Sequence, residues 1–228
     1  MFFQHKRSFK LSSNANNPGI YTQMATLLVC TGATITFEAL VKQVLKPDFV
    51  NLLIKSGVTK LVVQYGNEIR NNTHISQQLF QKTILENGLV SMLNSELEEG
   101  TNGMVSSFSR NGFELVCFPF SPNINDYIDQ ADVIISHAGT GSIIDSLYRN
   151  KKLIVVVNES LMDNHQEEIA REFVNSNYCL RFRYRDLLSE AFSTILHDLL
   201  NNNITLQKFP KKDGRVLETI ISEELKGK

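Results

Sequence analysis

The sequence contains no tryptophan, only five prolines and only three cysteines among its 228 residues. The cysteines, Cys30, Cys117 and Cys179, are odd in number and widely spaced, and each falls in a predicted strand. This pattern excludes a disulfide framework and a paired-cysteine zinc site. We expect three buried, reduced thiols in a reducing compartment. A catalytic cysteine is the alternative, although none of the three lies in a turn.

Strong charge of one sign and long apolar runs are also missing. The formal net charge is −1 at neutral pH, and without a basic run nothing indicates nucleic-acid binding. No apolar run approaches the roughly 20 residues of a membrane span, and no secretory segment is recognisable. Hydrophobic residues make up 42% and charged residues 21%, which is typical of a soluble globular protein with a sizeable core.

Several common catalytic motifs are absent. The sequence has no P-loop, no G-x-S-x-G elbow, no H-E-x-x-H zinc motif and no Asp-x-Asp pair for a metal-held diphosphate. Its glycine turn lacks the third glycine of the NAD fingerprint, and an acid follows that turn too soon to bind an NAD ribose. We therefore expect neither a metal nor a bound cofactor.

What the sequence does contain is an alternation of apolar strands with helical segments. Strand, helix and strand at this spacing predict parallel βαβ units, and thus a doubly wound α/β fold with a mostly parallel sheet of about six strands in one Rossmann-like domain. The most hydrophobic strand, 152–157, is expected at the centre of the sheet and buried on both faces. The predicted strands are 26–30, 61–65, 113–118, 132–136, 152–157 and 178–182, and the predicted helices are 37–45, 49–55, 77–89, 124–130, 142–149, 163–175 and 187–200.

The remaining segments fit this alternation less well. Residues 1–24 are polar and basic, and we expect disorder there, with a mitochondrial-type presequence as the alternative. Residues 95–112 are polar and contain glycine, which predicts a loop or insertion. The domain itself is expected over 25–205. An extension follows over 206–228, and its terminal helix from residue 216 either docks on a partner or closes the core.

The stretch that says most about function is DVIISHAGTGSIID, residues 132–145. A buried strand runs into a turn with Gly139 and Gly141, and a helix is predicted to begin near Ser142. Glycines admit a ligand close to the backbone, and the first N–H groups of a helix lack intrahelical partners. Asp145 lies on the same helix face as Ser142. An anion and a hydroxyl group would thus bind one turn apart, as in a sugar nucleotide. A plain βα turn capped by Ser142 is the alternative.

A second polar motif, Asp163-Asn-His-Gln166, opens the following helix. Asp163 and Gln166 have the spacing of a capping box, which explains Asp163 by helix structure alone. The planar, uncharged groups of Asn164, His165 and Gln166 are typical of side chains that bind sugar hydroxyls. We predict that this motif lies at the same sheet edge as the glycine turn.

Three loops should meet at that edge, because ligands of doubly wound sheets bind at the carboxyl ends of the strands near a switch in strand order. These loops are 31–35, 64–68 and 137–142, and the loop at 158–165 is expected to close the rim.

Taken together, ISHAGTGSIIDSL and MDNHQEEIA resemble the C-terminal, nucleotide-sugar-binding half of the GT-B glycosyltransferases, including their MurG-like members. The segments LVCTGAT, VQYGN and FPFSP extend the resemblance over roughly residues 26–225. Within this group the similarity is strongest to the catalytic subunits of two-subunit enzymes that add the second GlcNAc to dolichyl diphosphate-GlcNAc.

The resemblance implies roles for particular residues. Asp145 would bind the uridine ribose, and Gly32 would face the cleft. Asn164, His165 and Gln166 would contact the donor sugar, and His165 stands where related enzymes have an acid. The UDP diphosphate would be held by His137, Gly139, Thr140, Gly141 and Ser142.

The resemblance also implies a partner, because a complete GT-B enzyme has two α/β domains and this chain has room for one. A membrane-anchored subunit would bind the acceptor and hold this cytoplasmic chain on the cytosolic face of the endoplasmic reticulum. The substrates would be UDP-GlcNAc and dolichyl-diphosphate-GlcNAc, and no catalytic base is identified. Two alternatives remain: a UDP-GlcNAc epimerase and a non-catalytic nucleotide-sugar-binding module.

Overall fold

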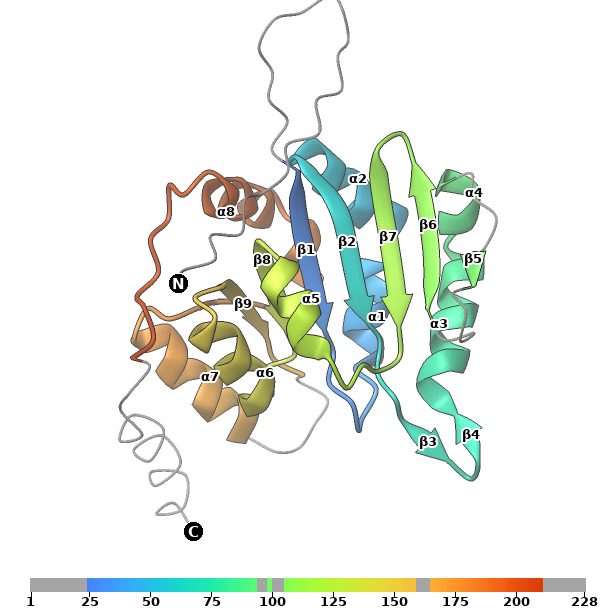
Figure 1. Cartoon of the computed structure of the whole chain (residues 1–228), viewed down its shortest axis with the longest axis horizontal. Helices are drawn as coiled ribbons and strands as arrows, with labels where there is room; N and C mark the ends of the chain where they lie inside the picture. The colour runs from blue at the N-terminus through green and yellow to red at the C-terminus, as the bar shows by residue number, and fades with distance from the viewer. Residues whose placement is uncertain (1–23, 94–97, 100–104, 159–164, 211–228) are drawn as a thin grey trace, which may run out of the picture.

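A computed structural model describes residues 24–93, 98–99, 105–158 and 165–210. Within these residues a twisted sheet is flanked by helices on both faces (Figure 1). The predicted N-terminal extension lies outside the described residues, apart from its last residue, Met24. The terminal helix expected from residue 216 lies outside them as well.

The main sheet has eight strands in the order β10-β9-β8-β1-β2-β7-β6-β5. Numbered along the chain, its six parallel strands lie in the order 3-2-1-4-5-6, which is that of doubly wound nucleotide-binding folds. The predicted fold class is confirmed, and the strand order reverses between β1 and β8. The parallel strands are β1 (Ala25–Cys30), β2 (Val58–Gln64), β7 (Phe113–Phe118), β8 (Val133–Ser136), β9 (Lys152–Val156) and β10 (Leu180–Phe182).

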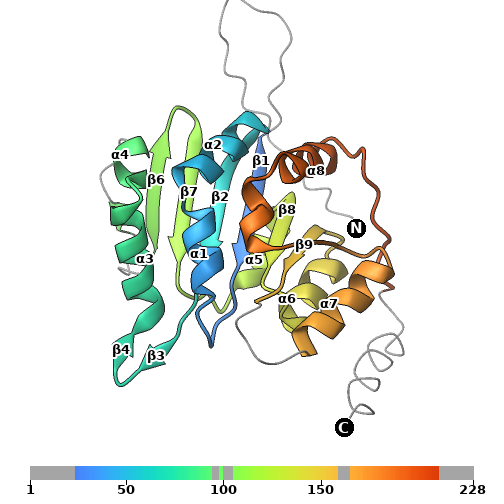
Figure 2. The ribbon, with the colours of Figure 1, turned by 180° about the vertical axis from the view of Figure 1, so that it is seen from behind.

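Helices form a layer on each face of the sheet. One layer consists of α5 (Ile124–Gln130), α6 (Thr140–Tyr148) and α7 (His165–Asn175), seen at the front in Figure 1. The opposite layer, seen in Figure 2, consists of α1 (Glu38–Val44), α2 (Pro47–Lys55), α3 (Ile75–Glu86), α4 (Leu89–Leu93), the 3-10 helix η1 (Tyr184–Leu188) and α8 (Glu190–Leu200).

In the part of the chain that is described, no helix is both long and apolar enough to cross a membrane.

Alternation along the strands creates two separate cores, because successive side chains of a strand point to opposite faces. In β1, Leu27 and Val29 pack against the layer of α1 and α8, whereas Leu28 and Cys30 pack against the layer of α6 and α7. All four are buried. The central strand is therefore apolar on both faces from Leu27 to Cys30 and lies between two helical layers.

The three cysteines also lie where the sequence predicts, in or beside the strands. All are free and buried. Cys30 ends β1, Cys117 lies in β7, and Cys179 directly precedes β10. Burial raises the pKa of the Cys179 thiol to about 12, so this thiol stays protonated at neutral pH.

The prediction that strand 152–157 lies at the centre of the sheet is wrong. β9 is indeed buried on both faces, with Leu153 and Val155 in one core and Ile154 and Val156 in the other. It nevertheless lies second from the edge, and β1 occupies the middle. A hydrophobic strand reports that helices cover both of its faces, and here they do so close to the sheet edge.

The prediction of a loop over 95–112 is wrong as well. Residues Ser106–Arg110 form β6, which pairs antiparallel with β7 and with β5 (Glu98–Glu99). Asn111 and Gly112 join β6 to β7 with φ values of 49° and 83°. Two consecutive positive φ angles suit a tight hairpin turn, for which Asn-Gly is the strongest sequence signal. The sequence of β6 is polar because the strand lies next to the sheet edge, where the two residues of β5 pair with only part of it.

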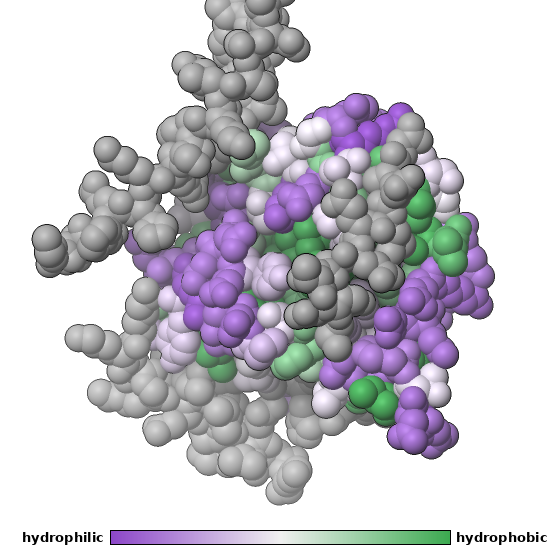
Figure 3. Space-filling view, turned by 45° about the vertical axis from the view of Figure 1, so that its right-hand side comes forward, coloured by the Kyte–Doolittle hydropathy of each residue, from purple (hydrophilic) through white to green (hydrophobic). Residues whose placement is uncertain are grey.

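A small hairpin, β3 (Ile69–Arg70) and β4 (Thr73–His74), precedes α3 and has no counterpart among the predicted elements. The predicted helix over 77–89 corresponds to α3, which ends at Glu86, and Gly88 at φ 66° separates it from α4. Hydrophilic side chains predominate on this side of the molecule (Figure 3).

Candidate functional site

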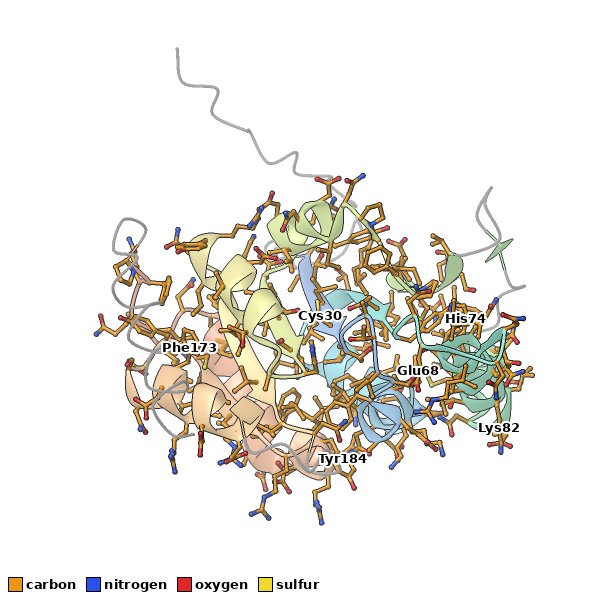
Figure 4. All side chains as sticks on the ribbon, turned by 90° about the horizontal axis from the view of Figure 1, so that it is seen from below. Cys30, Glu68, His74, Lys82, Phe173 and Tyr184 are labelled. Atoms are coloured by element: carbon orange, nitrogen blue, oxygen red, sulfur yellow. The ribbon has the colours of Figure 1, made fainter. Side chains whose placement is uncertain are left out.

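The carboxyl ends of β1, β2 and β8 meet at one edge of the sheet, toward which Figure 4 looks. The backbone N–H of His137 donates to the Cys30 carbonyl over 2.9 Å, which joins the turn after β8 to the end of β1. The N–H of Thr31 donates to the Gln64 carbonyl, and the N–H of Asn67 donates to the Ala33 carbonyl. The loops after these three strands therefore come together at the switch point, as predicted.

The His137 imidazole occupies a slot between two glycines. A Cβ added at Gly32 would lie 2.7 Å from His137 Nε2, and one added at Gly139 would lie 2.3 Å from the same atom. Both distances are far below van der Waals contact, so neither position accepts a side chain without moving the ring. Gly32 also has φ +86°, a conformation that glycine adopts without strain.

The turn before α6 differs from the predicted Gly-x-Gly turn. Its left-handed residue is Ala138, with φ 66° and a fully buried side chain. Gly139 has an ordinary φ of −70° and is the N-cap of α6. The helix begins at Thr140, two residues before the predicted start, and Gly141 lies within it next to open space. Gly139 is thus required by the imidazole beside it, and its backbone conformation would suit any residue.

The N-terminus of α6 has the geometry of an anion site. The N–H of Ile143 makes the first bond of the helix, to the Gly139 carbonyl over 3.1 Å. The N–H groups of Thr140, Gly141 and Ser142 precede that bond and lack partners within the helix. No side chain caps this end. Ser142 is the third residue of α6, so the alternative of a turn capped by Ser142 is wrong.

Asp145 lies one turn further along α6 and is half-buried. Burial, and secondarily the Asp145 carboxylate, raises the pKa of the Cys30 thiol to about 12. The carboxylate is therefore near the end of β1, on the side of α6 that faces the switch point. His137, the first N–H groups of α6 and Asp145 thus frame one place.

Burial lowers the pKa of His137 below its usual range, and the hydrogen bond to the Cys30 carbonyl opposes this only in part. His137 Nδ1 lies 3.3 Å from that carbonyl oxygen. A carbonyl oxygen only accepts, so Nδ1 carries the hydrogen. In the neutral ring Nε2 then carries no hydrogen and cannot donate a hydrogen bond to an anion. The ring becomes an Nε2 donor when it takes up a proton.

The second polar motif is described only in part. Helix α7 begins at His165, so His165 and Gln166 lie in its first turn, as predicted. Asn164 lies outside the described residues. The roles of Asn164, His165 and Gln166 in binding therefore stay predictions.

Asn158 follows β9 and was not predicted as a site residue. It is buried, 7% exposed, and reaches a small pocket of about 70 Å³ next to the imidazole. In the sequence, the one indication that Asn158 belongs to the site is that it is a polar residue directly after the most hydrophobic predicted strand, 152–157. The lining of this pocket comprises Thr31, Gly32, Thr34, Ile35, Phe37, His137 and Asn158.

A buried polar network that the sequence reading missed holds the loop after β1. The Thr36 N–H donates to Glu68 Oε2 over 2.8 Å, and the Thr36 hydroxyl lies 2.7 Å from that of Ser76. The Glu68 N–H donates to the same Ser76 hydroxyl. The Thr36 N–H, and with it the neighbouring Arg70, holds the pKa of the Glu68 carboxyl below its usual range, although burial opposes the shift. Glu68 thus stays ionised and fixes the loop that carries Gly32.

The side-chain amide of Gln64, at the end of β2, also holds the loop after β1 by hydrogen bonds. Its Nε2 donates to the Gly32 carbonyl over 2.7 Å and to the Pro119 carbonyl over 3.3 Å. In the sequence, the indication of this role is that Gln64 is a polar residue directly after the apolar run Leu61–Val63 of β2. Among the residues that are described, no three His, Cys, Asp or Glu side chains converge in a way that could hold a metal ion.

We predict opposite effects for alanine at the two glycines of this turn. Gly139→Ala forces a Cβ into the imidazole and should lower the free energy of unfolding by about 1–3 kcal/mol, the usual cost of overpacking. Gly141→Ala, the matched control, enters open space within a helix and should leave stability unchanged or raise it by up to about 1 kcal/mol. Urea unfolding of both variants measures the difference, and equal effects would contradict the slot around His137.

Comparison with known proteins agrees with this geometry. Residues 26–221 match the sequence profile of the glycosyltransferase family 28 C-terminal domain. The UDP-N-acetylglucosamine transferase subunit ALG13 of Candida albicans is 43% identical over 218 residues, which cover 89% of this chain and 74% of that protein.

Solved structures show the same fold. The solution structure of ALG13 superposes with a TM-score of 0.58 at 30% identity, covering 87% of this chain and 95% of that one. The crystal structure of Acinetobacter baumannii MurG, at 16% identity, has a TM-score of 0.51 and covers 79% of this chain but only 44% of its own. The chain therefore belongs to the family defined by the glycosyltransferase family 28 C-terminal domain and, within it, to the family of UDP-N-acetylglucosamine transferase subunit ALG13.

Proposed function

We propose that this chain is the donor-binding subunit of an N-acetylglucosaminyltransferase, which transfers GlcNAc from UDP-GlcNAc to dolichyl-diphosphate-GlcNAc. The observation that carries the proposal is the uncapped N-terminus of α6 at the switch point, with His137 on one side and Asp145 one turn away. The subunit name shared by its relatives supports the choice of donor.

Each part of the donor has a chemically matched group. The diphosphate binds the N–H groups of residues 140–142, because a helix N-terminus carries partial positive charge and free donors. His137 adds a charged donor once it is protonated. Asp145 accepts hydrogen bonds from the ribose hydroxyls. Gly141 leaves room for the ligand, since nothing lies within 4 Å of a Cβ placed there.

The donor sugar would lie beside the first turn of α7, where Asn164, His165 and Gln166 offer planar hydrogen-bonding groups to its hydroxyls. This arrangement keeps the sugar and the diphosphate on adjacent helix N-termini, α7 and α6.

In the reaction, a hydroxyl oxygen of the acceptor sugar forms a bond to the anomeric carbon of the donor GlcNAc. The bond from that carbon to the diphosphate oxygen breaks, and its electron pair leaves with UDP. The hydroxyl proton passes to a base of the partner half. Charge that develops on the departing diphosphate is stabilised by the helix N-terminus and by His137, which is electrostatic catalysis by fixed donors.

The acceptor half of the enzyme would belong to a second polypeptide. The relatives carry the name of a transferase subunit, which supports a complex with a second polypeptide. We infer a membrane-anchored partner that binds the lipid-linked acceptor. It would keep this chain on the cytosolic face of the endoplasmic reticulum.

Reconstitution tests the proposed function directly. The purified chain is assayed for transfer from UDP-GlcNAc alone and together with membranes that contain the partner. Activity in the mixture only is expected. Activity of the chain alone would remove the need for a partner, and no transfer in either case, with UDP-GlcNAc bound, would identify a non-catalytic binding module.

Asp145→Ala should weaken donor use without affecting assembly. Losing hydrogen bonds to a charged acceptor costs about 1.5–3 kcal/mol, so kcat/KM for UDP-GlcNAc should fall by roughly 10- to 150-fold. Asp48→Ala is the matched control, because Asp48 is an exposed carboxylate in the first turn of α2. Both variants should still co-purify with the partner, and normal turnover in Asp145→Ala would refute the role of Asp145.

Donor binding should depend on pH through His137. Its pKa is lowered in the free protein and rises when the diphosphate binds beside it, so binding takes up a proton between these two values. As the pH rises through this interval, affinity for UDP-GlcNAc should fall by up to about tenfold per pH unit. Below the free pKa the ring is already charged, and the dependence disappears.

Calorimetric titration of UDP-GlcNAc at a series of pH values checks this, because the donor's diphosphate does not titrate near neutrality. The Cys30 thiol also stays protonated there, since its pKa is about 12. His137→Gln should give a flat profile, and an unchanged slope in that variant would assign the proton to another group.

A further inference from the structure

A second hollow opens at the same sheet edge, and none of the residues assigned above to the donor lines it. It is a groove of about 490 Å³ between the loop after β1 and the start of α3. Its lining includes Glu68, Arg70, Gln78, Lys82 and Asn158. In Figure 4, Glu68 and Lys82 lie on the α3 side of Cys30, away from α6 and α7.

The floor of the groove is held by a buried carboxylate. Glu68 is 7% exposed, and its Oε2 accepts the Thr36 N–H while its Oε1 lies 2.5 Å from Arg70 Nη2. A carboxylate has about four acceptor positions. Glu68 therefore retains capacity to accept from ligand hydroxyls, and its own position is fixed by the network with Thr36 and Ser76.

The walls combine an amide, two cations, aliphatic surface and a second carboxylate, Glu38, which is paired with Lys42. Gln78 is exposed on α3 one turn before Lys82. The Lys82 side chain is 67% exposed and its ammonium lies 3.8 Å from the Glu86 carboxylate, an ion pair too weak to hold it. Ile75 and Leu79 add apolar area. A carboxylate, an amide and an aliphatic patch suit a saccharide, and cations at the rim suit an attached phosphate.

The groove adjoins the pocket at the imidazole, since Ile35 and Asn158 line both. In the proposed reaction the acceptor hydroxyl must touch the anomeric carbon of the donor, so the acceptor sugar has to lie directly beside the donor site.

We propose that this groove binds the sugar–diphosphate end of the acceptor, so that the chain contributes to acceptor recognition as well as donor binding. The inference rests on the proposed transferase function. Glu68 and Gln78 contact hydroxyl or amide groups of the acceptor sugar, and Arg70 and Lys82 attract the diphosphate. The acceptor is thus recognised by both subunits.

The test uses the two-subunit enzyme with a short-chain isoprenyl diphosphate-GlcNAc as acceptor. Gln78→Ala and Lys82→Ala each alter an exposed residue of α3 and favour the helix. Each should raise KM for the acceptor by about 5- to 10-fold, the size of one hydrogen bond or charge contact, and leave KM for UDP-GlcNAc unchanged. The Lys82→Ala effect should shrink at high salt, and the Gln78→Ala effect should not.

Two matched controls lie at the opposite end of the sheet. Lys55 ends α2 and Gln130 ends α5, and both side chains are exposed. Lys55→Ala and Gln130→Ala should leave both KM values unchanged.

An unchanged acceptor KM in both α3 variants would overturn the proposal. A rise in KM for UDP-GlcNAc instead would assign the groove to the donor. Loss of co-purification would make the groove a docking surface for the partner. Either result also overturns the proposal. If the wild-type complex shows no transfer, the proposed function fails separately. Equilibrium binding of the isoprenyl diphosphate-GlcNAc to the same wild-type and variant complexes then decides whether the groove binds it.

Discussion

The contact between the ends of β1 and β8 is the constraint on which the site depends. Here the strand order reverses, and the His137 N–H donates a hydrogen bond to the Cys30 carbonyl at the end of the neighbouring strand. The imidazole fills the space between two glycines, one from each strand's loop. The hydrogen bond and the ring between the two glycines determine how the two loops pack, and the N-terminus of α6 follows directly after the second loop.

Much of the fold was predictable because helices on both faces make each parallel strand an apolar run. The errors have the same physical origin. β9 is buried on both faces but lies second from one edge, and β6 is polar because it lies second from the other, beside the two-residue strand β5. Local composition reports how well a strand is covered, whereas its place in the sheet depends on the path of the whole chain. The Asn111-Gly112 turn was a local signal for β6, and it was overlooked.

The candidate site was predictable in its location but less so in its details. Gly32, His137 and the start of α6 meet as expected, because loops at the carboxyl ends of parallel strands share one edge. The left-handed residue is Ala138, however, and Gly139 is needed for space. Gly139 is constrained by the imidazole of His137, whose position depends on a hydrogen bond to Cys30, 107 residues away, and one sequence does not reveal such a contact. The same is true of Glu68, whose partners lie on another loop.

The Gln64 amide has a consequence for how the site meets its ligands. One buried side chain ties together carbonyls from the loops after β1 and β7, while its own backbone carbonyl accepts from Thr31. The rim on this side of the switch point is therefore preorganised, and its conformational entropy is lost during folding, before any ligand arrives. A ligand that binds here therefore meets loops whose shape is already set, and little further ordering of these loops opposes its binding.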